Sequence, residues 1–182
     1  DMSEAQDNSI IGYLVPDPEA PEYYNAYIGS DGYIRVNPDS HYWFYMMQNL
    51  MEINFDNYDT TNLRSMSYMF ASARSLEKLD ISNFDTSSVN NTGYIDNPGM
   101  YKMFADCKNL VVLDLSNFDT NNVTDMFGMF YGCGSLTSLD LSKFNTSIVT
   151  TMSSMFEETY KLQEVKLGAN FSFTGNGSTS CT

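Results

Sequence analysis

Cysteine, histidine and basic residues are scarce in this chain of 182 residues, and each scarcity excludes a class of protein. Three cysteines are too few for the disulfide framework of a small secreted domain, and they leave the redox compartment open. Nine lysines and arginines against 23 aspartates and glutamates give a net charge of −14, which makes nucleic acid and anionic membranes poor partners. No apolar run is long enough to span a bilayer.

Catalytic signatures are also missing. The single histidine, His41, has no serine, cysteine or aspartate at a spacing that indicates a catalytic arrangement. The sequence has no glycine-rich phosphate loop and no cysteine–histidine cluster with metal-ligand spacing. We therefore expect no enzyme and no resident cofactor. The first residues lack a basic and apolar signal segment, so we expect any export signal to lie outside this sequence.

Apolar and aromatic residues are abundant. The hydrophobic fraction is 42%, with 12 methionines, 12 phenylalanines and 13 tyrosines. This content predicts a folded chain whose core is packed by soft and aromatic side chains.

The chain contains an internal sequence repeat. One copy reads Leu76-Glu-Lys-Leu-Asp-Ile-Ser-Asn-Phe-Asp-Thr, and the next reads Leu110-Val-Val-Leu-Asp-Leu-Ser-Asn-Phe-Asp-Thr. Copies begin at Leu50, Leu76, Leu110, Leu136 and Leu162. The step is 26 residues except between the second and third copies, where eight extra residues fall within Asn90 to Gly99. A fixed period of this length predicts a stack of equivalent units.

Each unit suggests a strand followed by a helix. Leu79 and Ile81 alternate with Asp80 and Ser82, which is the spacing of a strand. In the second half of each repeat, apolar residues recur at steps of three and four. This spacing predicts a helix with its apolar residues along one side. In one copy these are Val123, Met126, Met129, Phe130, Cys133 and Leu136. The Asp-Thr pair before each stripe suits helix N-caps, including the row Asp59, Asp85, Asp119 and Asn145.

We therefore predict an α/β fold, a right-handed leucine-rich-repeat solenoid of about five units over residues 40–170. A parallel sheet would cover one face and short helices the other. Residues 1–39 would form a lead-in and an N-terminal β-hairpin cap, with the hairpin in residues 23–37. Residues 171–182 would form a C-terminal cap strand or tail. We expect a monomer.

The repeat unit, LxxLDLSxFDTxxVxxMxxMFxxC, resembles that of the BspA-like leucine-rich-repeat proteins of bacterial surfaces, over roughly residues 40–170. The resemblance implies an extracellular or cell-surface location and a role in adhesion or host interaction, with no catalytic residue. The sequence departs from the family at the insertion, where Thr92-Gly93-Tyr94 breaks the repeat, and at Lys166, which replaces aspartate in the last strand.

One outward position of the strands carries a row of polar residues, Asn54, Asp80, Asp114, Asp140 and Lys166. Carboxylates stacked about 4.8 Å apart repel one another. Ser82, Ser116 and Ser142 share the face and are candidate hydrogen-bond donors. A calcium ion or a partner presenting lysine or arginine would also offset the repulsion. A solvated row without a ligand, a partner-binding face and a calcium site remain open alternatives.

The predicted function is recognition or adhesion at a cell surface, through binding of a host protein or glycan. The alternative is a structural spacer that displays other domains. The candidate ligand-binding residues are Asp80, Ser82, Asp114, Ser116, Asp140, Ser142 and Tyr94 of the insertion. Cys107 and Cys133 occupy equivalent positions of adjacent repeats, where a disulfide or two buried free thiols remain open.

Overall fold

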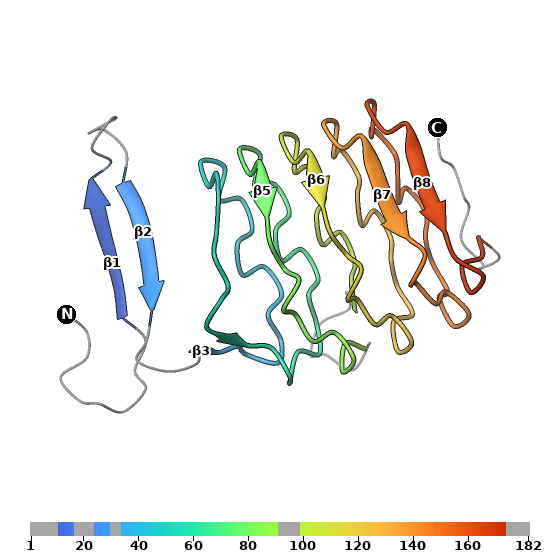
Figure 1. The fold of residues 1–182 in the computed structure, drawn as a ribbon, viewed down its shortest axis with the longest axis horizontal. Helices are drawn as coiled ribbons and strands as arrows, with labels where there is room; N and C mark the ends of the chain where they lie inside the picture. The colour runs from blue at the N-terminus through green and yellow to red at the C-terminus, as the bar shows by residue number, and fades with distance from the viewer. Residues whose placement is uncertain (1–10, 17–23, 30–33, 91–98, 174–182) are drawn as a thin grey trace. The chain divides into compact units, whose positions relative to one another are not determined.

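The computed structural model describes residues 11–16, 24–29, 34–90 and 99–173, with side chains described from residue 34 onward. The chain forms two compact units (Figure 1). The first comprises residues 1–36 and 56–59, and the second residues 37–55 and 60–182. Within the described part of the chain, no segment forms a helix long and apolar enough to cross a membrane.

The first unit contains two pairs of strands. Strand β1 (Ile11–Pro16) pairs antiparallel with β2 (Tyr24–Gly29), and β3 (Ile34–Arg35) pairs parallel with β4 (Tyr58–Asp59). The hairpin predicted within residues 23–37 is therefore wrong. Residues 24–29 pair with a six-residue upstream strand instead, and residues 34–35 pair with a segment of the first repeat.

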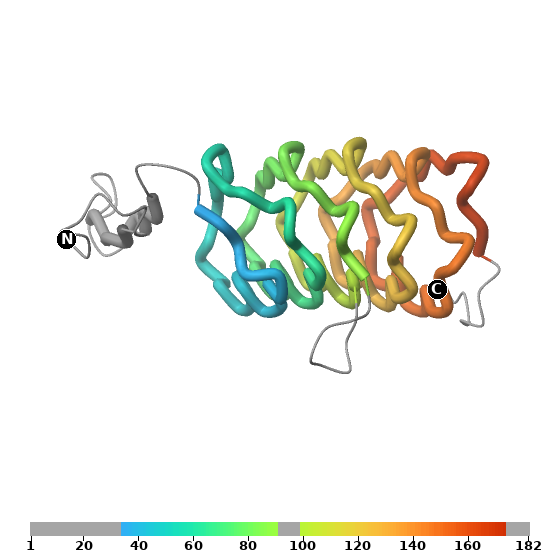
Figure 2. The backbone as a smooth tube through the Cα atoms, turned by 90° about the horizontal axis from the view of Figure 1, so that it is seen from below, coloured from blue at the N-terminus to red at the C-terminus, as the bar shows by residue number. Residues whose placement is uncertain are grey.

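The second unit is a stack of coils, one for each repeat (Figure 2). Strand β5 (Lys78–Leu79) pairs parallel with β6 (Val112–Leu113), and β7 (Ser138–Leu141) with β8 (Glu164–Leu167). These four strands lie side by side and point the same way (Figure 1). Leu79 is paired with Leu113 and Leu139 with Val165, so equivalent residues of successive repeats are neighbours, as the period indicated.

The described residues form no helix, so the predicted α/β leucine-rich-repeat solenoid is wrong. The amides of the expected helical segment alternate between two kinds of partner. Those of Met69 and Ala71 close tight turns onto carbonyls three residues back, whereas those of Tyr68 and Phe70 donate to the next coil. A helix would direct every amide to the carbonyl four residues back, and that arrangement would leave the coils unconnected.

Left-handed backbone makes this alternation possible. Two residues of each coil, four positions apart, have φ between 49° and 69°. They are Tyr42, Met46, Tyr68, Ser72, Lys102, Asp106, Gly128, Gly132, Ser154 and Glu158. Such residues interrupt a helix at a cost of about 1–2 kcal/mol each for residues with a Cβ, which the bonds to the next coil offset.

The core contains a column of phenylalanine rings that runs through all the coils. Neighbouring rings have centroids 5.4–5.8 Å apart and planes within 11° of parallel. The column consists of Phe44, Phe70, Phe104, Phe130 and Phe156. The apolar stripe that suggested a helix is buried all the same, because the successive turns direct every third or fourth side chain inward.

The Asp-Thr pairs do not cap helices. The buried hydroxyl of Thr86 donates to the carbonyl of Asp119 at 2.9 Å and accepts its amide at 2.8 Å. Thr120 does the same with Asn145. The carboxylate of Asp85 accepts the amide of Ser87, which is the local bond of a cap formed in a turn without a helix. The threonines therefore connect one coil to the next.

The insertion begins and ends at neighbouring points of the stack. The amide of Asn90 donates to the carbonyl of Arg64, and the amide of Met66 donates to the carbonyl of Gly99. Both ends of the insertion are thus fixed to positions two residues apart in the preceding coil. Residues 91–98, with the candidate Tyr94, lie outside the described residues.

Candidate functional site

The predicted row of polar side chains lies on the outer face of the parallel strands. Asp80, Asp114 and Asp140 are exposed, whereas Leu79 and Ile81 on either side of Asp80 are buried. The alternation places every second side chain of the strand segment in solvent. We call this surface the sheet face and define it by Asp80, Ser82, Val112, Asp114, Ser116, Asp140, Ser142 and Lys166.

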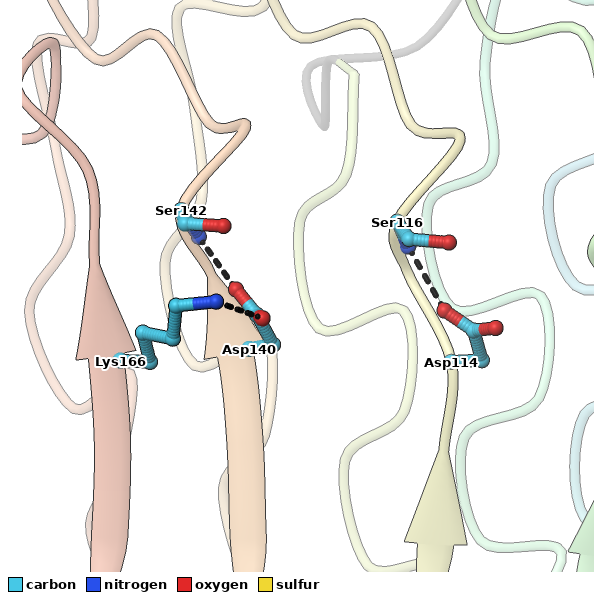
Figure 3. A network of polar contacts seen from close by, with 5 residues as sticks. All are labelled: Asp114, Ser116, Asp140, Ser142 and Lys166. Carbon is cyan, nitrogen blue, oxygen red and sulfur yellow. Dashed lines mark hydrogen bonds and ion pairs between the residues drawn. The ribbon is translucent and has the colours of Figure 1, made fainter.

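Each aspartate of the sheet face accepts a hydrogen bond from the serine two residues further on. The amides of Ser116 and Ser142 lie 2.9 Å from Oδ1 of Asp114 and Asp140 (Figure 3). Asp80 accepts both the amide of Ser82, at 3.0 Å, and its hydroxyl, at 2.7 Å. In each pair the bond from the backbone amide fixes the carboxylate beside the chain, and at Ser82 the hydroxyl donates as well.

At the end of the row a lysine neutralises one aspartate. Lys166 stands opposite Asp140 in the register of β7 and β8, and its Nζ lies 2.8 Å from Oδ2 of Asp140 (Figure 3). This bond, followed by those from Ser142, holds the pKa of Asp140 well below its usual range. The same contact raises the pKa of Lys166.

Asp80 is stabilised as a carboxylate by the serine that follows it. The hydroxyl of Ser82, followed by its amide, lowers the pKa of Asp80. Asp80 and Asp140 are therefore both held as carboxylates, and Asp140 already binds an ammonium group. Lys166, which looked like a departure from the repeat, shows the geometry in which a cation fits on the sheet face.

One residue of the sheet face was missed by the sequence analysis. Val112 is 70% exposed and precedes Asp114 by two residues on the same side of the strand segment. The equivalent positions in other repeats hold Lys78, Ser138 and Glu164, which are all charged or polar. The sequence could have revealed this residue, because valine stands at a position that is charged or polar in these other repeats. It places an exposed apolar side chain beside the acidic row.

Two other predictions concern Tyr94 and a calcium site. Tyr94 lies outside the described residues. Among the residues that are described, no three histidine, cysteine, aspartate or glutamate side chains are grouped to hold a metal ion, so the calcium interpretation finds no set of ligands there.

The two equivalent cysteines are buried free thiols. The Sγ atoms of Cys107 and Cys133 each contact a phenylalanine carbonyl of the preceding coil, at 3.2 and 3.0 Å. Burial raises the pKa of Cys133 to about 12, so the thiolate is not available for chemistry at neutral pH. These two thiols serve packing.

Aromatic side chains outside the core pack against one another. Tyr42 stacks on Tyr68 with centroids 4.8 Å apart and planes 13° from parallel, and Tyr101 stacks on Phe127 at 5.1 Å and 12°. Each ring covers one face of its neighbour. A sugar ring binds against a free aromatic face, so this packing reduces the surface that would favour a glycan.

Three comparisons with known proteins bear on the chain. A family model described as "Mycoplasma protein of unknown function, DUF285" matches residues 38–97 and 98–171, which contain all the coils of the second unit. No curated protein and no solved structure matches the chain.

Proposed function

We propose that this chain, which belongs to the DUF285 family, is a non-catalytic recognition module whose sheet face binds a protein ligand that presents lysine or arginine. The observation that carries the proposal is the contact between Lys166 and Asp140. A basic side chain occupies one step of the acidic row there. The next two steps, Asp114 and Asp80, offer exposed carboxylates held by the same kind of serine bond.

Val112 adds an apolar contact beside those carboxylates. Protein interfaces combine an apolar centre with charged groups around it, and the charges mainly set specificity and the rate of association. The pairs Tyr42–Tyr68 and Tyr101–Phe127 each have one ring face covered, which leaves less aromatic surface there for a glycan. The resemblance of the repeats to BspA-like surface proteins supports an extracellular or cell-surface location and an adhesive role.

The test is a binding screen against purified extracellular matrix proteins and neutral glycans, followed by the double variant Asp80→Asn with Asp114→Asn. Asparagine keeps the side-chain oxygen that accepts the serine amide, so the turns remain while two charges are lost. Binding of a protein ligand should weaken at least tenfold and become less sensitive to salt.

The matched control is Glu77→Gln with Glu157→Gln, which removes the same charge from positions outside the sheet face. A ligand that binds both double variants as well as the native chain would refute the proposal. A ligand lost equally by both variants would show a general charge effect and would also refute it.

The alternative is a structural spacer. The threonine bonds and the phenylalanine column connect every coil to the next, as a rigid rod requires. A screen that yields no ligand of any class would favour the spacer.

A further inference from the structure

The sheet face changes at two positions together where the row of aspartates stops. In three consecutive coils an aspartate is followed two residues later by a serine, as in Asp140 and Ser142. In the coil that contains β8, the same two positions hold Lys166 and Gly168. The lysine reverses the charge of the row at this point, so Asp140 is the last carboxylate of the series.

The glycine lets β8 approach β7 closely. A Cβ atom at Gly168 would overlap the backbone carbonyl of Ser142. The two strands are paired in parallel, with Asp140 opposite Lys166. The close approach therefore holds the lysine beside the last aspartate, where its Nζ lies 2.8 Å from Oδ2 of Asp140.

The three aspartates differ in which oxygen remains available to a ligand. Oδ1 of each accepts the amide of the serine that follows it. Within the part of the chain that the structure describes, Oδ2 of Asp80 and Oδ2 of Asp114 accept no hydrogen bond and form no ion pair. Oδ2 of Asp140, in contrast, accepts the ammonium group of Lys166 (Figure 3). A basic group from a ligand would find two carboxylates open and the third occupied.

A ligand can displace Lys166 only by competing with it. The side chains of Lys166 and Asp140 are 62% and 50% exposed, and exposed ion pairs are weak because water solvates both partners. Glu164 lies on the same side of β8 and also attracts the ammonium group, so the lysine has a second carboxylate nearby. Binding at Asp140 therefore costs the ligand a competition that binding at Asp80 and Asp114 does not.

We propose that Lys166 is a specificity-determining residue of the sheet face, which closes Asp140 to the ligand and limits the face to a segment with two neighbouring basic side chains. Those side chains would bind Asp80 and Asp114. An apolar side chain beside them would contact Val112, which is 70% exposed and two residues from Asp114. This inference rests on the proposed function, and it adds the class of ligand and the residue that limits its length.

Titration with capped dilysine and trilysine peptides at low salt, followed by amide NMR, tests the proposal. The amides of Ser82, Ser116 and Ser142 report on the three carboxylates separately, because each amide donates to one of them. In the native chain both peptides should shift the signals of Ser82 and Ser116 and leave the signal of Ser142 nearly unchanged.

Lys166→Gln removes the competing charge and keeps a side chain that can donate a hydrogen bond. Trilysine should then shift the Ser142 signal as well. It should also bind about two- to fivefold more tightly than it binds the native chain, as expected when a weak exposed ion pair no longer competes. The matched control is Lys161→Gln, which removes the same charge from an exposed position of the same coil outside the sheet face. In this control the Ser142 signal should remain unresponsive, and the same spectra show that each variant is folded.

Three results would overturn the inference. In the first, the Ser142 signal of the native chain shifts with trilysine as much as that of Ser116. In the second, the Ser142 signal stays unresponsive in Lys166→Gln. In the third, Lys161→Gln gains the same response, which is a general charge effect. The proposed function survives each of these results if Ser82 and Ser116 respond to the peptides. If neither of them responds to either peptide, the proposed function fails and this inference fails with it.

Discussion

Replacing Thr86 by valine tests whether the threonines connect the coils. Valine has nearly the shape of threonine and lacks the hydroxyl, so the packing stays while two hydrogen bonds to Asp119 are lost. Thr86 is 1% exposed, and Asp119 is half-buried, so water replaces these bonds only in part. At about 1 kcal/mol for each bond, the free energy of unfolding should fall by about 2 kcal/mol.

Urea unfolding followed by circular dichroism and by the fluorescence of the single tryptophan, Trp43, measures the change. With a slope of about 2 kcal/mol per molar urea, the midpoint should fall by about 1 M. Thr137→Val makes the same replacement at an exposed position and should leave the midpoint nearly unchanged. Equal midpoints for the two variants would refute the role assigned to Thr86.

Three further predictions follow from single contacts. Lys166→Gln should raise the pKa of Asp140 toward its ordinary value of 3.8, as measured by carboxyl NMR titration. In the native chain this ion pair stabilises the fold above pH 3.8, and its contribution is lost only as the pH falls through the lowered pKa of Asp140. If the variant leaves the pKa of Asp140 unchanged, the ion pair with Lys166 is excluded. Gly168→Ala should destabilise the last strand by at least about 1 kcal/mol in the same urea assay, because its Cβ would overlap the carbonyl of Ser142, and wild-type stability would contradict that close approach. Cys133 should resist thiol reagents in the folded protein and react once urea unfolds it, and rapid native labelling would contradict its burial.

The sequence was informative where side-chain periodicity determines the structure. The 26-residue step placed Leu79 beside Leu113 in parallel register, and the alternation along the strand segment placed Asp80 in solvent. Both follow from counting residues, because equivalent positions of a stacked repeat must be neighbours. The serine partners were predicted for the same reason.

The sequence led to the wrong secondary structure where two different backbone conformations bury the same side chains. Apolar residues at steps of three and four suit a helix, and a run of tight turns buries them equally well. What separates the two is the left-handed backbone, which glycine marks at Gly128 and Gly132 but which Tyr68 and Lys102 adopt without any such sign. The choice is made by bonds to the neighbouring coil, which no single repeat reveals.

The site was predicted in part for a related reason. The carboxylates recur in three consecutive copies, as Asp80, Asp114 and Asp140, and were visible, whereas Val112 and Lys166 depart from the residues at the equivalent positions. Exceptions in a repeat are where one surface becomes different from the others.

The anchoring of Asn90 and Gly99 to positions two residues apart has a consequence for how the chain can change. The number of residues between these anchors does not alter the spacing of the coils on either side. Foreign sequence spliced between them, such as a peptide tag, should leave the packing of the stack intact. The chain therefore carries a natural insertion point at which new binding sequence can be added without redesign of its framework.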